Sequence, residues 1–415
     1  MSPTYAWLKS KSFFTGRPTR FTVMLMAGAS ITLMFIFTAY QYSDNYDPQS
    51  YFHPKITPAE HNNTRTGKCS AEAYASGSWK PANKFPQGTK MNESNDAIAF
   101  GGFEGCAADR EFFWHLGADR PDQWENRFPM AFDHVWSPSK ECDIRPLDRD
   151  ALVTDLVEKG GWLLIGDSVT ENHFFSLSCL LSPHVRATPN YTENPYYERH
   201  WQQNLYLLPT SPLVPNLKFP EGFSIENTPL VSFRRVDLLL SREELEGLYA
   251  SIYARGPDSP LFSEEAFWSL SPHEYVQQFT SKENNYQTMV VSTAGHWTTG
   301  LFLGMRDPNS KGDGVGNILQ FYVHATAMWA DLVQRILNES DRSDRQVIVR
   351  AYLSGHEDCF NHFEPYTYIH GYTTHWWNWS WMTEYNDIFK VRTPTILYFA
   401  RPNPAIVVAA LPFIP

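Results

Sequence analysis

The sequence lacks an excess of basic residues: 34 lysines and arginines stand against 45 aspartates and glutamates, which gives a formal net charge of −11. This balance argues against a general nucleic-acid-binding protein, which would carry a basic face. Cysteine is scarce, with five residues and no zinc-finger spacing among them. The chain has no internal repeat, and only one apolar run is long enough to cross a membrane. Its 415 residues leave room for one large domain or two ordinary ones.

The long apolar run covers residues 21–40 and contains no charged residue. Basic residues precede it and acidic residues follow it, and cationic flanks stay on the cytosolic side of a membrane. The pattern predicts a single-pass type II protein, with residues 1–20 as cytosolic tail, 21–40 as signal anchor and 41–66 as a polar stem. A cleaved signal peptide is the alternative, but the run is long and no small-x-small cleavage site follows it.

Two further features suit a secretory lumen. Asn-x-Ser/Thr triplets are glycan acceptors only there, although such triplets also arise by chance. An oxidising lumen favours disulfides, and an odd number of cysteines leaves one thiol without a partner in the chain. The triplets are headed by Asn62, Asn92, Asn190, Asn338 and Asn378, and the cysteines are Cys69, Cys106, Cys142, Cys179 and Cys359.

Residues 67–149 are rich in Gly, Pro, Trp and Cys and predict an irregular, disulfide-stapled subdomain. Regular patterns begin at residue 150. Helices are expected over 151–159, 170–181 and 317–338, another helix after the capping box of Ser241 and Glu244, and buried strands over 162–165, 288–292 and 345–353. Strands alternating with helices predict an α/β domain over 150–390, with a parallel sheet covered on both faces. The tail over 391–415 lacks helical spacing, caps and polar turns; it is either a final buried strand or an abnormal terminus.

The strongest chemical motif is Gly166-Asp167-Ser168, between a predicted strand and a predicted helix. A serine on such a turn projects its hydroxyl at the carboxyl edge of the sheet, where the helix offers free backbone N–H groups to a developing oxyanion. Glycine permits the turn. We interpret Ser168 as a nucleophile; the alternative is that Asp167 or Ser168 is only a helix N-cap.

Two later segments reach the same edge of the predicted sheet. Gly295 and His296 follow the second strand, where His296 could orient substrate or donate to an oxyanion, or simply pack in a turn. His356 and Asp358 follow the third strand and are candidates for the base and its orienting carboxylate. A zinc site that adds Cys359 and His362 is the weaker reading, because in the lumen Cys359 favours a disulfide.

Together these pieces resemble the trichome birefringence-like, or PC-esterase, family of polysaccharide O-acetyltransferases, and fungal members more than plant ones. The resemblance covers roughly residues 69–390 and implies an SGNH/GDSL-esterase-like fold. The motifs that carry it are Cys69 with Gly77-Ser78-Trp79, Cys106 with Arg120-Pro121-Asp122, Trp136 with Pro138 and Cys142, the block from Gly166 to Leu181, the strand ending in Gly295-His296-Trp297, and the segment from Arg350 to His356.

The resemblance implies a Golgi protein in which Ser168 is acylated and passes an acetyl group to a sugar hydroxyl. Asn172 occupies the place of a family Asn after the serine and is an oxyanion candidate. The family's Arg just before it is Glu171 here, and an Asn of plant members is Thr293. The family's catalytic Asp and His come from a C-terminal Asp-x-x-His segment, and none occurs after Lys390. We therefore expect a truncated or misassembled gene product.

Two hypotheses follow. The first is a Golgi O-acyltransferase, or the related carbohydrate esterase, that acts on a polysaccharide or glycan through an acyl-Ser168 intermediate. The second is an inactive lumenal glycan-binding or scaffold protein, which the missing Asp-x-x-His segment favours. A glycosyltransferase is weaker, because no convincing Asp-x-Asp metal site is present. No cofactor or metal is expected; the acyl donor comes from the lumen or from a partner protein.

Overall fold

The computed structural model describes residues 76–108, 121–129, 132–140, 142, 147–190, 202–254, 259–353, 355, 378–397 and 406–409. The chain divides into two compact units, Met1–Thr66 and Gly67–Pro415, and everything below belongs to the second. The predicted cytosolic tail, anchor and stem lie outside the described residues. Within the described ranges, no helix combines the length and the apolar character that a membrane crossing requires.

The second unit is built on a seven-stranded sheet with the order β4-β5-β6-β3-β7-β8-β9. Strands β6, β3, β7, β8 and β9 run parallel, whereas β5 pairs antiparallel with both β4 and β6. The α/β class is therefore confirmed, and the purely parallel sheet is corrected to a mixed one. The strands are β3 Gly161–Gly166, β4 Val185–Thr188, β5 Gln203–Leu207, β6 Val231–Arg235, β7 Tyr286–Ser292, β8 Gln346–Arg350 and β9 Ile406–Ala409.

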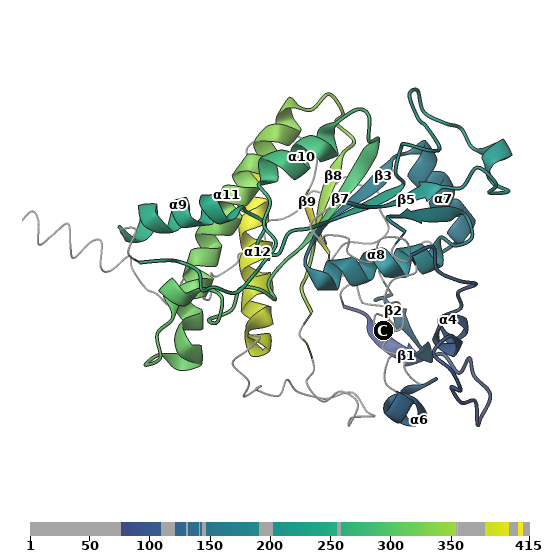
Figure 1. Cartoon of the computed structure of the whole chain (residues 1–415), viewed down its shortest axis with the longest axis horizontal. Helices are drawn as coiled ribbons and strands as arrows, with labels where there is room; N and C mark the ends of the chain where they lie inside the picture. The colour runs from purple at the N-terminus through teal and green to yellow at the C-terminus, as the bar shows by residue number, and fades with distance from the viewer. Residues whose placement is uncertain are drawn as a thin grey trace, which may run out of the picture. The chain divides into compact units, whose positions relative to one another are not determined.

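Helices cover both faces of this sheet (Figure 1). Successive side chains of a strand point to opposite faces, so Leu164 packs with α7 and α8, whereas Leu163 and Ile165 pack with the core beneath α9, α10, α11 and α12. Both faces are buried, which explains why β3 and β7 read as continuous apolar runs. The helices are α7 Arg149–Glu158, α8 Ser168–Leu180, α9 Arg242–Tyr253, α10 Pro272–Thr280, α11 Val315–Glu339 and α12 Met382–Leu397.

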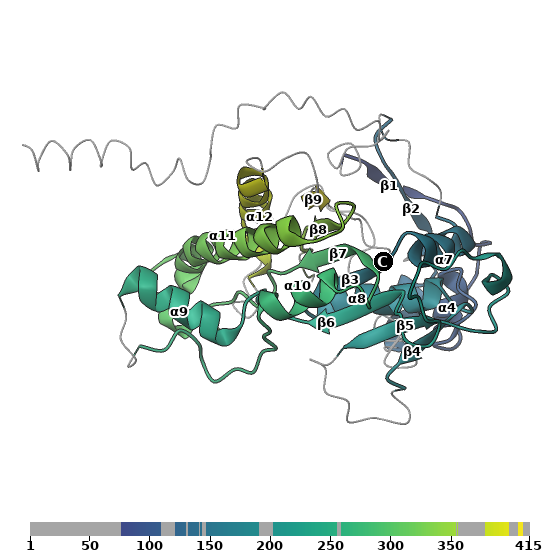
Figure 2. The ribbon, with the colours of Figure 1, turned by 90° about the horizontal axis from the view of Figure 1, so that it is seen from above.

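The side on which successive strands are added to the sheet changes at β3. Counted in chain order, the parallel strands lie in the order 2-1-3-4-5, since β6 lies on one side of β3 and β7 on the other (Figure 2). Right-handed crossovers then place α8 on one face and α10 and α11 on the other. In such sheets, ligands bind beyond the carboxyl ends of the strands at the point of reversal. Here that point lies between β3 and β7.

Most predicted elements of residues 150–390 are present, with boundaries moved by a few residues. The capping box is confirmed: Ser241 accepts from the Glu244 N–H, and the Glu244 side chain accepts from the Ser241 N–H. The third strand is shorter than the predicted 345–353. Regular structure continues past residue 390, because α12 runs to Leu397 and β9 adds a fifth parallel strand beside β8.

Regular structure is short in the described part of residues 67–149. Strands β1 Ser78–Pro81 and β2 His134–Ser137 form an antiparallel ribbon, which brings Trp79 opposite Trp136 with ring centroids 5.5 Å apart. Two motifs of the sequence thus meet across this ribbon. The short helices described here are α4 Asp96–Phe100 and α6 Trp124–Arg127. The 3₁₀ turns in the described part of the unit are η1 Pro121–Gln123, η3 Val214–Asn216, η4 Leu303–Met305, η5 Lys311–Gly314 and η7 Trp379–Trp381.

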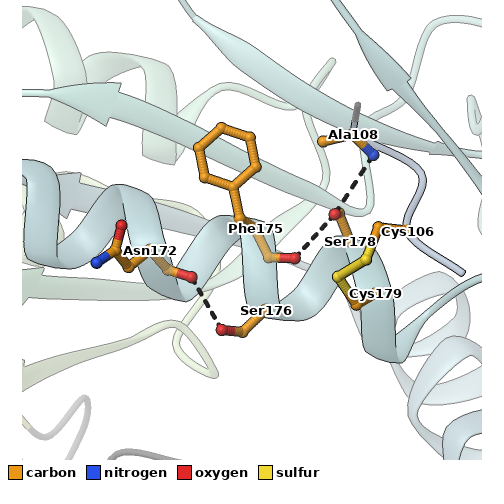
Figure 3. The surroundings of a disulfide bond; sticks show 7 residues. All are labelled: Cys106, Ala108, Asn172, Phe175, Ser176, Ser178 and Cys179. Atoms are coloured by element: carbon orange, nitrogen blue, oxygen red, sulfur yellow. Dashed lines mark hydrogen bonds between the residues drawn. A yellow bond between two sulfur atoms is a disulfide. The ribbon is translucent and has the colours of Figure 1, made fainter. Parts of the chain in front are cut away.

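A disulfide joins this subdomain to the α/β domain. Cys106 bonds Cys179 near the end of α8, across 73 residues of sequence (Figure 3). Beside it, the Ala108 N–H donates to the Ser178 hydroxyl at 3.3 Å. Cys142 is disulfide-bonded as well. The predicted disulfide bonding of this region is therefore confirmed, and one disulfide reaches the helix that begins at Ser168.

Candidate functional site

Ser168 is the first residue of α8, directly beyond β3. Its side chain is partly exposed. Asp167 is the N-cap: its Oδ1 accepts from the Val169 N–H at 3.0 Å, and its carbonyl accepts from Thr170 and Glu171. Sequence left open whether Asp167 or Ser168 was the cap, and the structure gives that place to Asp167. These bonds use the N–H groups of Val169, Thr170 and Glu171, so of the first N–H groups of α8 only that of Ser168 has no acceptor in Asp167.

Gly166 makes the turn between β3 and α8 possible. Its φ is +158°, and a Cβ at this position would collide with the Thr170 side chain and with the Ser292 carbonyl, 2.5 Å away. A side chain here would push α8 away from β7 or twist the strand end. The glycine of the predicted motif is therefore required by close approach as well as by backbone conformation.

Side chains from the ends of β6 and β8 hold the first turn of α8. Arg350 Nη2 donates to Thr170 Oγ1 at 3.1 Å. Tyr352 donates its hydroxyl to Asp167 Oδ2 at 2.7 Å. Arg235 Nη1 lies 3.6 Å from Glu171 Oε2. All of these groups are buried, so the turn that presents Ser168 is fixed by polar contacts in a low-dielectric interior.

Glu171, the acidic residue three positions after Ser168, lies in a buried polar network. Its side chain is 2 % exposed and accepts from Gln203 Nε2 at 2.9 Å on Oε1, while Oε2 faces Arg235. A buried carboxylate is tolerated only when it is paired and hydrogen-bonded. The acidic residue is therefore part of a buried ion pair rather than a group open to solvent.

His296 lies in the turn that follows β7, the neighbour of β3 in the sheet. Its ring is 12 % exposed, and Nε2 lies 3.8 Å from Oδ1 of Asp237, a longer distance than a hydrogen bond. Asp237 is fully buried and accepts from Arg235 Nε at 2.7 Å and from the Trp268 N–H at 2.9 Å. Because β3 and β7 are neighbours, with Gly166 opposite Ser292, the turns of Ser168 and His296 share one edge.

Asp167 is the most perturbed carboxyl group of the site. Its complete burial raises its pKa, and the nearby Asp237 carboxylate raises it further. His296, the Tyr352 hydroxyl and Arg235 act in the opposite direction because they favour the charged form. A carboxyl group with a shifted pKa at the ligand-binding edge of an α/β sheet is typical of a functional site.

A second histidine near this turn, His173, is on α8. Burial and the positive charge of Arg350 lower the pKa of His173 to about 3, so the ring is neutral near neutral pH. Its Nδ1 makes no hydrogen bond with any described residue. Five residues along a helix also rotate a side chain by about 140° from the Ser168 direction. His173 is therefore a poor base for Ser168.

The remaining predicted site residues have mixed outcomes. Asn172 lies one helical turn after Ser168, on the same side of α8, and is partly exposed, as an oxyanion candidate requires. Gly295 packs closely against Tyr352, because a Cβ there would meet the Tyr352 hydroxyl. His356 and Asp358, the candidates for base and orienting carboxylate, lie outside the described residues, as does the predicted acceptor Asn62.

The glycan acceptors differ in exposure. Asn92, Asn190 and Asn338 are exposed. Asn378 is 6 % exposed, and its Nδ2 donates to the Trp297 carbonyl at 3.1 Å. Because a glycan would be attached to that same nitrogen, the folded chain leaves no room for one. The prediction of an acceptor at Asn378 does not fit the structure.

Sequence reasoning missed four members of the site: Arg235, Asp237, Arg350 as a contact of α8, and Tyr352. None of them belongs to a short motif that signals chemistry by itself. Each lies within two residues of the end of β6 or β8, so attention to every polar residue at a strand end would have found them.

Groups of three or more metal-binding side chains are absent from the described ranges. No protein-family model and no curated protein matches the chain.

Proposed function

We propose that the protein is a serine-dependent O-acyltransferase, or the related esterase, that forms an acyl-Ser168 intermediate and acts on the hydroxyl groups of a polysaccharide or glycan. The observation that carries the proposal is the partly exposed Ser168 on a glycine-permitted strand-to-helix turn, at the reversal point of a doubly wound sheet. This arrangement supports acyl transfer because a serine at the start of a helix can present both its hydroxyl and its backbone N–H to an acyl group.

In the first half-reaction, Ser168 Oγ attacks the carbonyl carbon of the acyl donor while its proton passes to a base. The N–H of Ser168 stabilises the oxyanion, and the bond to the leaving group breaks as the base returns the proton to it. In the second half-reaction, the base takes a proton from a sugar hydroxyl or from water, whose oxygen attacks the acyl carbon. The Ser168 ester then breaks and Ser168 regains its proton.

His296 is the base that the described residues support best. It follows β7 at the same sheet edge as Ser168, and the buried Asp237, whose Oδ1 lies 3.8 Å from its Nε2, can orient the ring. Its separation from Asp237 is long, but catalytic hydrogen bonds often tighten only when substrate binds. The role of His356 and Asp358 stays a prediction.

The resemblance to the trichome birefringence-like family supports the acetyl group as the acyl group and the Golgi lumen as the location. The strand order supports the SGNH/GDSL-like form of the α/β fold. Membrane attachment through residues 21–40 remains part of the proposal, and so does a partner protein that supplies the acyl donor. The alternative is a catalytically inactive glycan-binding or scaffold protein.

The test is covalent labelling of the full chain with a fluorophosphonate, which reacts with activated serines. We expect labelling of the wild type and none of Ser168→Ala. Ser176→Ala is the matched control, because Ser176 is on the same helix and only donates to the Asn172 carbonyl. His296→Gln should slow labelling by about 100-fold or more, the range of a lost general base. A folded wild type that is never labelled would support the binding protein instead.

A further inference from the structure

Tyr352 has a hydroxyl that the mechanism above does not use. Its side chain is 4 % exposed and lies two residues beyond β8. The hydroxyl donates to Asp167 Oδ2 at 2.7 Å, and Asp167 Oδ1 accepts from the Val169 N–H at 3.0 Å. The Asp167 carboxylate thus bridges Tyr352 and the start of α8. Any movement of the Tyr352 hydroxyl is transmitted to the residue next to Ser168.

Tyr352 is itself held by the helix α12. Its N–H donates to Asn386 Oδ1 at 2.7 Å, and Asn386 Nδ2 donates to its carbonyl at 2.9 Å. The same helix reaches the other turn of the site, because the Tyr385 hydroxyl donates to the Trp297 carbonyl at 2.8 Å. One helix therefore fixes the turns that follow β7 and β8.

The charge of Asp167 matters for this bridge. An ionised carboxylate accepts from both Val169 and Tyr352, whereas a protonated one loses acceptor capacity on one oxygen. The groups that act on it come from every side of the site: His296 after β7, Arg235 and Asp237 at β6, Arg350 of β8, and Tyr352. Burial opposes ionisation and the Tyr352 hydroxyl favours it.

We propose that Tyr352 is a positioning residue for Ser168: its hydroxyl holds Asp167, which fixes the first turn of α8, and Asn386 holds Tyr352 in place. The inference rests on the proposed nucleophilic role of Ser168. The alternative is an ordinary buried hydroxyl that contributes only to stability.

The experiment measures the rate constant of fluorophosphonate labelling against pH in the full chain. Tyr352→Phe keeps the ring, so we expect a folded protein labelled about tenfold more slowly near neutral pH, the worth of one hydrogen bond to a charged group. The pH at which labelling reaches its plateau should move upward, since Asp167 loses a donor that lowers its pKa. Tyr275→Phe is the control, because that buried hydroxyl donates to the Leu239 carbonyl and accepts from Trp329 Nε1 rather than bonding Asp167.

Further variants separate positioning from stability. In an Asp167→Asn background, Tyr352→Phe should change the rate by less than about threefold, since residues that act through one another are not additive. Should Tyr352→Phe fail to fold, Asn386→Ala serves as a partly buried second variant with the same expected slowing. Wild-type rates in Tyr352→Phe or in Asn386→Ala, or equal effects in both backgrounds, overturn the inference alone. A wild type that is never labelled overturns the proposed function and this inference together.

Discussion

The disulfide between Cys106 and Cys179 allows a quantitative test of how the irregular subdomain contributes to stability. The bridge closes a loop of 73 residues. In the chain-entropy description, a closed loop of this length lowers the entropy of the unfolded chain enough to stabilise the folded state by about 4 kcal/mol at 25 °C. We therefore expect Cys106→Ala to lower the free energy of unfolding by about 4 kcal/mol, near the upper end of the usual range of roughly 2–5 kcal/mol for native bridges.

The assay is equilibrium unfolding in urea, followed by tryptophan fluorescence. Because either single substitution removes the whole bridge, Cys106→Ala, Cys179→Ala and the double variant should lose similar stability, within about 1 kcal/mol for the buried volume of Cys179. Ser178→Ala is the control: it removes one hydrogen bond between the same two segments and should cost about 1 kcal/mol.

The same variants keep stability apart from chemistry. Cys179 is at the opposite end of α8 from Ser168, about 17 Å away along the helix axis. Labelling of the folded fraction should therefore match the wild type. Destabilisation below about 1 kcal/mol in the double variant would refute the loop-entropy reasoning, and slow labelling of the folded protein would refute the separation.

Three further outcomes are expected. Gly295→Ala should lower the free energy of unfolding in urea by about 1–3 kcal/mol, because the added Cβ meets the Tyr352 hydroxyl. In a Tyr352→Phe background the loss should be smaller. Equal losses in both backgrounds would count against the contact. Burial raises the pKa of Asp167, so the contribution of this group to stability is present at acidic pH and falls as the pH rises through that raised pKa. The difference in unfolding free energy between wild type and Asp167→Asn should follow this trend. A difference that does not change with pH would contradict it. In protein secreted from eukaryotic cells, peptide mapping should find glycan on Asn338 and none on Asn378; glycan on Asn378 in folded protein would show that its bond to Trp297 is not essential.

The elements predicted best carry their signal within a few adjacent residues. The capping box needs only Ser241 and Glu244, and β3 is a short apolar run between glycines. The strand β6 was missed because its residues end in two arginines, while the more apolar stretch beside it, 236–240, is buried as a loop. Apolar character predicted burial there, but not the kind of backbone.

Pairing between distant strands could not be read from local patterns. The strands β4 and β5 pair antiparallel with each other, and β5 with β6, which depends on partners elsewhere in the chain. The helix α12 continues to Leu397 although the sequence after Lys390 lacks helical spacing, so its end could not be read from periodicity. The candidate site shows the same division: Ser168 stands out in the sequence through its turn, whereas Tyr352 is recognisable only through its contact with Asp167.

The bond between Tyr352 and Asp167 joins residues that are 185 positions apart in the sequence. Contacts of this separation form late in folding, because the intervening chain must be ordered before they lower the free energy. During refolding, helical signal should therefore return well before Ser168 becomes reactive. Labelling of this one hydroxyl would then report that the whole sheet has assembled, and partly folded molecules would not be labelled.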